Sequence, residues 1–187
     1  AEAISLFIQH AMLKEMLDAQ DEDNLVVWDI GLGSGAIAMA AIMEYEKIFM
    51  QNSRIKSMKV ISFAKETDAL KLAVKNQELF YHTRHSAPGV FLRDGTWVSC
   101  KYPLQWHLIE SDIPENYTET LMPHCVFYNP FPNVINEHLR NYSMFKNIFS
   151  AKIHSGIKIF SRLDSVMVKA TLLAAGFYTG IITIPSM

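Results

Sequence analysis

A short apolar segment that runs directly into a glycine-rich turn is the feature that most constrains this fold. Residues 25–30 include two valines, a tryptophan and an isoleucine, which is typical of a strand buried on both faces. The turn Gly31-Leu32-Gly33-Ser34-Gly35 follows at once, and residues 36–50 then have a helical composition. This order of strand, tight turn and helix predicts the first part of a β-α-β unit with parallel strands.

Strand and helix patterns continue to alternate along the chain. We expect strands at 60–64, 104–109, 125–128, 157–161 and 177–184, with a short edge strand at 96–99 in a loop-rich stretch from 82 to 102. Helical patterns cover 3–17, 67–80, 134–153 and 164–175, the last closed by Gly176. The alternation predicts an α/β, Rossmann-like fold with a mostly parallel sheet, helices on both faces and ligands at the carboxyl ends of its strands.

Length and composition fit one globular domain spanning residues 1–187. Half of the residues are hydrophobic, 19% are charged and the formal net charge is -2, which disfavours a strongly basic surface for nucleic acid. Lys152, Lys158, Arg162 and Lys169 could form a local basic patch that meets RNA phosphates, but a solvated face is the favoured interpretation of these charges. Two cysteines without a CxxC pair, and no long apolar run, favour a cytoplasmic protein that does not span a membrane.

The glycine turn predicts a site for a small molecule. Gly31, Gly33 and Gly35 allow a sharp turn and leave no Cβ against a ligand. The pattern Gly31-x-Gly33-x-x-Ala36 also matches the dinucleotide fingerprint, so nicotinamide or flavin binding stays an alternative. Asp29 favours a different ligand, because a carboxylate at this strand end repels a pyrophosphate but attracts an amino group and a sulfonium. S-adenosylmethionine carries both of these positive groups.

Acidic residues follow two further predicted strands. Glu66 is the nearest acid after the second strand, where it would either accept hydrogen bonds from ribose hydroxyls or serve as a favourable charge at a helix N-terminus. Glu110-Ser111-Asp112 closes another strand, and an acid there would either receive an adenine amino group or cap a turn. We expect Glu66 and Asp112 to take part in cofactor binding.

The corner Asn129-Pro130-Phe131-Pro132 follows a buried strand and should emerge at the same sheet edge as the glycine turn. The Asn129 side-chain oxygen and a backbone carbonyl would orient the hydrogens of an amine nucleophile. Phe131 would pack on the substrate or face a cationic sulfonium. The simpler alternative is that Asn129 and Pro130 make a turn while Phe131 belongs to the core.

A metal site is not indicated. His82 and His85 form an H-x-x-H pair, but no nearby acid or third ligand completes a zinc set.

Taken in order, these segments resemble the MnmC-like S-adenosylmethionine-dependent methyltransferase family, related to the methyltransferase domain of a bifunctional enzyme of tRNA 5-methylaminomethyl-2-thiouridine biosynthesis. The resemblance rests on residues 26–33, on 60–63 with 68–70, on 106–112, on 127–131 and on a closing pattern at 160–162 and 172–178. It spans most of the chain. Three departures are that the family usually has an acid at the position of Ala64, an aspartate at that of Asn129 and a glycine at that of Ser111.

The resemblance implies methyl transfer from S-adenosylmethionine to an amine, in the relative the aminomethyl nitrogen of a tRNA wobble uridine. It implies tRNA as a partner and a separate oxidoreductase acting on the same nucleoside, since no oxidoreductase half is present in this sequence. Asp29 and the three turn glycines would hold the donor, and Asn129, Pro130 and Phe131 would form the catalytic corner. Methylation of a small amine or protein side chain, and a cofactor-binding module without catalysis, are the alternatives.

Overall fold

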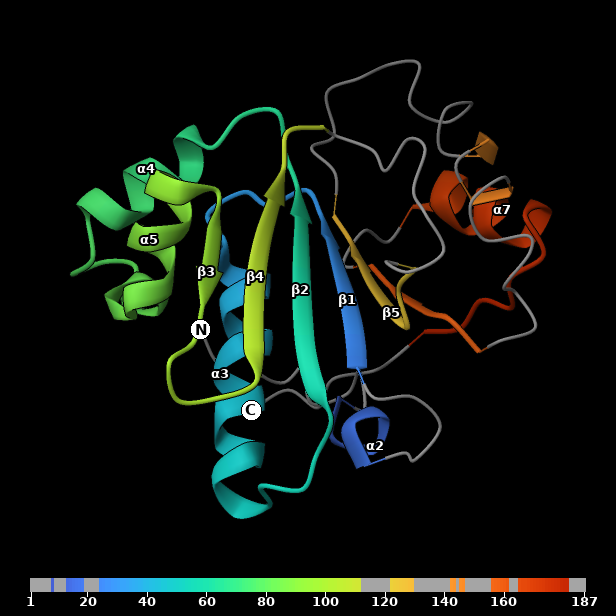
Figure 1. Ribbon diagram of the computed structural model, residues 1–187. Helices are drawn as coiled ribbons and strands as arrows, with labels where there is room; N and C mark the ends of the chain where they lie inside the picture. Colours follow the sequence, from blue (N-terminus) through green and yellow to red (C-terminus); the bar gives the residue numbers. More distant parts are fainter. Residues whose placement is uncertain are drawn as a thin grey trace.

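One six-stranded sheet forms the centre of the computed structural model, which describes residues 8, 13–18, 24–111, 122–129, 142–143, 145–146, 156–161 and 165–181 (Figure 1). The strand order is β3-β4-β2-β1-β5-β6. The strands are β1 (Asn24–Ile30), β2 (Ser57–Phe63), β3 (Thr96–Val98), β4 (Leu104–Ile109), β5 (Cys125–Tyr128) and β6 (Lys158–Phe160). Every pairing is parallel except that of β3 with β4 at the edge.

The register aligns the ends of the four central strands. Ile30 at the end of β1 lies opposite Phe63 of β2 on one side and Tyr128 of β5 on the other, and Phe63 lies opposite Ile109 of β4. The chain passes from β1 to β2 on one side of β1, and it later returns to place β5 on the other side. Such a reversal of strand order opens a crevice at the carboxyl ends of the strands, where open α/β sheets bind ligands.

Helices cover both faces of the sheet, so the predicted α/β class and the mostly parallel sheet are confirmed. The helical segments are α2 (Leu13–Asp18), α3 (Ala36–Gln51), α4 (Asp68–Lys75), the 3-10 turn η1 (Tyr81–Arg84), α5 (Ser86–Asp94) and α7 (Val166–Ala174). Val27 and Val60 pack on one face in a core shared with α3 and α5. Trp28 and Ile61 alternate to the other face and join a second core with Leu172 of α7. In Figure 1, α3 runs behind the strands and α7 lies beyond β5.

The prediction that residues 82–102 are mainly loop is wrong, because α5 lies within this stretch. Pro88 occupies the third position of α5, in the first helical turn, where its missing N–H breaks no helical hydrogen bond. Gly95 then ends the helix with a φ of 69°, and its N–H donates to the Phe91 carbonyl at 2.9 Å. The adjacent Pro88-Gly89 pair suggests a loop, although the first turn of a helix tolerates the proline.

Other boundaries differ at the ends of the elements. The helix predicted at 67–80 stops at Lys75, and residues 177–181 are not in a strand, contrary to the expectation for 177–184. The predicted helix at 134–153 is described only at four residues, and Pro130, Phe131 and Asp112 lie outside the described residues. Within the part of the chain that the structure describes, no helix is long and apolar enough to cross a membrane.

Candidate functional site

The ends of β1, β2, β4 and β5 are joined by hydrogen bonds just beyond the sheet. The Gly31 N–H donates to the Phe63 carbonyl at 3.4 Å, and the Ala64 N–H donates to the Ile109 carbonyl at 3.1 Å. On the other side of β1, the Asn129 N–H donates to the Ile30 carbonyl at 2.9 Å. The glycine turn therefore leaves the sheet between the residues that follow β2 and the corner that follows β5.

The glycines of the turn have different surroundings. Gly33 has a φ of 52°, and among the described residues a Cβ built on it would meet only the Gly31 carbonyl oxygen, at 3.9 Å. Gly35 has a φ of 73°, and its Cβ would lie 3.0 Å from Leu70 Cδ1 and 3.5 Å from the Trp106 ring. The open side of the turn at Gly33 can take a ligand, whereas Gly35 allows the turn to pack on α4 and β4.

The two histidines of the H-x-x-H pair serve separate structural roles. His82 Nε2 donates to the Ser34 carbonyl oxygen at 2.9 Å and so braces the glycine turn from η1. His85 caps α5 by accepting a hydrogen bond from the Ala87 N–H, and its Nε2 lies 3.3 Å from Glu46 Oε1. No group of three His, Cys, Asp or Glu side chains among the described residues is arranged to hold a metal ion.

Asp29 is the one buried acidic or basic side chain among the described residues. Its Oδ2 accepts a hydrogen bond from Ser62 Oγ at 2.9 Å, and Ser62 Oγ accepts one from Trp106 Nε1 at 2.9 Å. Asp29 Oδ1 is buried without a hydrogen-bond partner among the described atoms. Burial raises the pKa of Asp29 from 3.8 to about 6, and the Ser62 hydrogen bond opposes this rise. A buried carboxyl group with a raised pKa thus precedes the turn by two residues.

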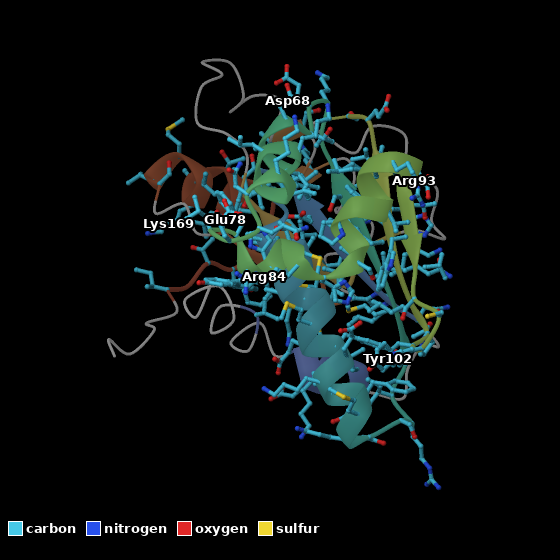
Figure 2. The ribbon with its side chains drawn as sticks, turned by 90° about the vertical axis from the view of Figure 1, so that its left-hand side faces the viewer. Asp68, Glu78, Arg84, Arg93, Tyr102 and Lys169 are labelled. Carbon is cyan, nitrogen blue, oxygen red and sulfur yellow. The ribbon has the colours of Figure 1, made fainter. Side chains whose placement is uncertain are left out.

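A cleft of about 600 Å³ opens over the ends of β2 and β4. Its walls come from the segment after β2, from the end of α5 and from the end of β4: residues 64–68, Lys71, residues 92–95, Leu108 and Glu110. Figure 2 shows Asp68 and Arg93, both lining residues, at the upper end of the molecule, where the strands of Figure 1 point. The predicted cofactor residue Glu66 lies in this cleft.

The acids of the cleft fall into two kinds. Asp68 pairs with Lys71 at 2.9 Å, and Asp94 pairs with Arg93 at 2.8 Å. Glu66 and Glu110, which are exposed, have no ion pair or side-chain hydrogen bond among the described residues. These two carboxylates are therefore available to accept hydrogen bonds from hydroxyl or amino groups of a ligand.

Sequence reasoning missed two residues of this site. Ser62 and Trp106 complete the buried chain to Asp29, but both stand in apolar runs that suggest plain core strands. The single hydroxyl at Ser62, inside the otherwise apolar end of β2, was the available signal. Pairing it with Asp29 requires the register between β1 and β2, which places the two residues opposite each other.

No family model matches the chain, and no curated protein sequence matches it either. The structure itself defines an α/β protein with a mostly parallel sheet. At one edge of this sheet lie an open glycine turn, a buried carboxylate and a cleft with two available acids.

Proposed function

We propose that this chain is a cytoplasmic S-adenosylmethionine-dependent methyltransferase of the Rossmann-like class, which transfers a methyl group to an amine. The observation that carries the proposal is the pairing of an open turn at Gly33 with the buried carboxylate of Asp29 two residues before the turn. The turn also stands at the reversal of strand order, where ligands bind in α/β sheets.

The residues at the turn fit the charge of the proposed cofactor. A buried carboxylate is poorly screened, so it attracts a nearby positive group and repels a phosphate. Asp29 Oδ1 lacks a donor among the described residues, and an ammonium group is a donor of the missing kind. A dinucleotide would instead bring its pyrophosphate to this turn, next to the same negative charge.

The cleft fits the nucleoside part of the cofactor. Glu66 and Glu110 would accept hydrogen bonds from the ribose hydroxyls and the adenine amino group, because neither carboxylate is engaged by another described residue. Ala64 is buried in the cleft wall, so it offers no polar contact, and Glu66 two residues later would replace an acid at that position. Asp112, the other acid proposed for this role, lies outside the described residues.

Asn129 is the residue proposed to act on the methyl acceptor. Its backbone N–H donates to the Ile30 carbonyl next to the glycine turn, and in this proposal its side-chain oxygen would orient the hydrogens of an incoming amine. S-adenosylmethionine supplies an activated methyl group, and the chain's residues then need mainly to position the amine and exclude water. Pro130 and Phe131 belong to the same proposed corner.

The acceptor is proposed from the resemblance to the MnmC-like family: an aminomethyl group on a tRNA wobble uridine, prepared by a separate oxidoreductase. A small amine or a protein side chain is the alternative acceptor, and the net charge of -2 suits it.

A transfer assay tests the proposal directly. The protein is incubated with methyl-labelled S-adenosylmethionine and either undermodified tRNA or a panel of small primary amines, and label in the acceptor is counted. We expect transfer to one of the two acceptor classes. Binding without any transfer would favour an inactive cofactor module. The absence of both binding and transfer would contradict the proposal.

Two glycine variants give a matched comparison. Gly33→Ala places a methyl group on the open side of the turn, whereas Gly156→Ala adds one before β6, with no described atom within 4 Å, at a similarly positive φ of 81°. Both substitutions strain the backbone by about 1–2 kcal/mol. We expect only Gly33→Ala to weaken S-adenosylmethionine binding, by at least tenfold, and equal losses in both variants would contradict a ligand site at the turn.

A further inference from the structure

Three buried polar groups form a chain across neighbouring strands. Trp106 of β4 donates its Nε1–H to Ser62 Oγ of β2, and Ser62 donates its hydroxyl hydrogen to Asp29 Oδ2 of β1, each at 2.9 Å. All three side chains are buried. These direct hydrogen bonds therefore link the carboxylate beside the glycine turn to β4, two strands away.

The direction of these hydrogen bonds is fixed by the chemistry of the groups. An indole N–H can only donate, so Ser62 Oγ must accept from Trp106. A hydroxyl has a single hydrogen, and the one that Ser62 carries remains for Asp29. Asp29 Oδ2 is thereby held as an acceptor, which leaves Oδ1 as the second acceptor and the one without a partner among the described residues.

The indole that begins this chain is itself held firmly. Trp106 stacks on Phe91 of α5, with ring centroids 3.9 Å apart and planes inclined by 17°. Its ring edge also lies 3.5 Å from the Cβ position of Gly35. The absence of a side chain at Gly35 therefore lets the indole sit against the turn.

We propose that Ser62 and Trp106 are positioning residues, which hold the Asp29 carboxylate in one orientation as the acceptor for the positively charged amino group of a ligand at the glycine turn. This inference rests on the proposed function, and it adds how the site selects a cationic ligand over a phosphate-bearing one. A negative charge that a fixed donor stabilises costs less to keep in the apolar interior.

The surroundings of Asp29 make its pKa a sensitive measure of the hydrogen bonds that join Trp106, Ser62 and Asp29. Its cross-strand neighbours are Ser62 on β2 and Phe127 on β5. Burial and the Ser62 hydrogen bond are the two causes of its altered pKa, and no other charged group contributes. Loss of the Ser62 hydroxyl should therefore raise the pKa of Asp29 further, because burial would then act alone.

The experiment follows the Asp29 carboxyl carbon by NMR as the pH is raised, in the ligand-free full chain, with Asp29→Asn used to assign the signal. Wild type should titrate near pH 6. Ser62→Ala should titrate at higher pH, and Trp106→Phe should shift the midpoint in the same direction by less, since the hydroxyl remains but is no longer oriented. The control is Trp97→Phe. Trp97 of β3 lies opposite Trp106 in the β3–β4 register but takes no part in the hydrogen bonds from Trp106 through Ser62 to Asp29.

Binding is measured in parallel by calorimetry with S-adenosylmethionine. At pH 7, Ser62→Ala should bind roughly tenfold more weakly, and the deficit should shrink as the pH rises. Unchanged midpoints in Ser62→Ala and Trp106→Phe, or an equal shift in Trp97→Phe, would overturn the inference. If wild type bound no S-adenosylmethionine at any pH, the proposed function would fail, while the NMR titration would still decide whether Ser62 and Trp106 orient Asp29.

Discussion

Gly35 and Leu70 are in contact across the glycine turn: a Cβ added to Gly35 would lie 3.0 Å from Leu70 Cδ1. The turn thus uses its glycines for two purposes, because a Cβ at Gly33 would contact no described side chain while Gly35 meets the buried side of α4. A substitution at Gly33 should therefore weaken ligand binding, whereas a substitution at Gly35 should lower stability.

Gly35→Ala is expected to destabilise the fold. The substitution combines a positive φ with a close contact to Leu70 and Trp106, so we expect it to lower the free energy of unfolding by about 2–4 kcal/mol. Urea denaturation measures this change, with Gly156→Ala as the control for backbone strain alone. Equal stabilities of the two variants would show that the Leu70 contact relaxes at no cost.

Asp29 should make stability depend on pH. Its pKa of about 6 in the folded protein lies above the ordinary value of 3.8, so the folded state holds this proton more tightly than the unfolded chain does. The resulting stabilisation is complete below about pH 4 and is lost as the pH rises through 6, and a difference of about two in pKa corresponds to roughly 3 kcal/mol.

Comparison with Asp29→Asn isolates this contribution, because an amide does not titrate. Urea denaturation of both proteins between pH 4.5 and 7.5 should show the variant gaining stability relative to wild type as the pH rises. Parallel stability curves would contradict the raised pKa.

The cleft acids should differ in their effect on ligand binding. Glu66→Gln and Glu110→Gln each remove an available carboxylate, and we expect S-adenosylmethionine affinity to fall by roughly tenfold in each variant. Asp94→Asn is the matched control, since this lining carboxylate is already paired with Arg93. If Asp94→Asn reduced the affinity as much as Glu66→Gln, the nucleoside would not be held as proposed.

The two cysteines should react very differently with thiol reagents. Cys100 is exposed, whereas Cys125 is buried in β5 and burial raises its pKa above the ordinary range. Titration with a chromogenic disulfide should therefore modify one thiol in the native protein and two after denaturation. Rapid modification of both thiols in native buffer would show that β5 opens readily.

Much of the sheet could be predicted because its strands carry strong local patterns. The strands at 104–109 and 125–128 have the predicted boundaries, and β1 differs only by the inclusion of Asn24. The helix α5 was missed because its Pro88-Gly89 pair resembles a turn when its place within the helix is unknown. Local sequence does not reveal that the proline falls in the first helical turn.

The site was predictable only where residues lie close in sequence. Asp29 and the turn glycines form one short motif, so their proximity needs no tertiary information. Ser62 and Trp106 reach Asp29 through the register of three strands, which the sequence does not specify. The same limit applies to the cleft, which Glu66 and Glu110 line together because the Ala64 N–H donates to the Ile109 carbonyl at the end of β4.

The most direct test of the central claim is a calorimetric titration of the wild-type chain at pH 7 with S-adenosylmethionine and, separately, with NAD. A turn beside the Asp29 carboxylate should bind the first and not the second, and Gly33→Ala should weaken that binding. Binding of NAD with no response to S-adenosylmethionine would contradict the account, because it would show that the turn accepts a pyrophosphate despite the buried negative charge.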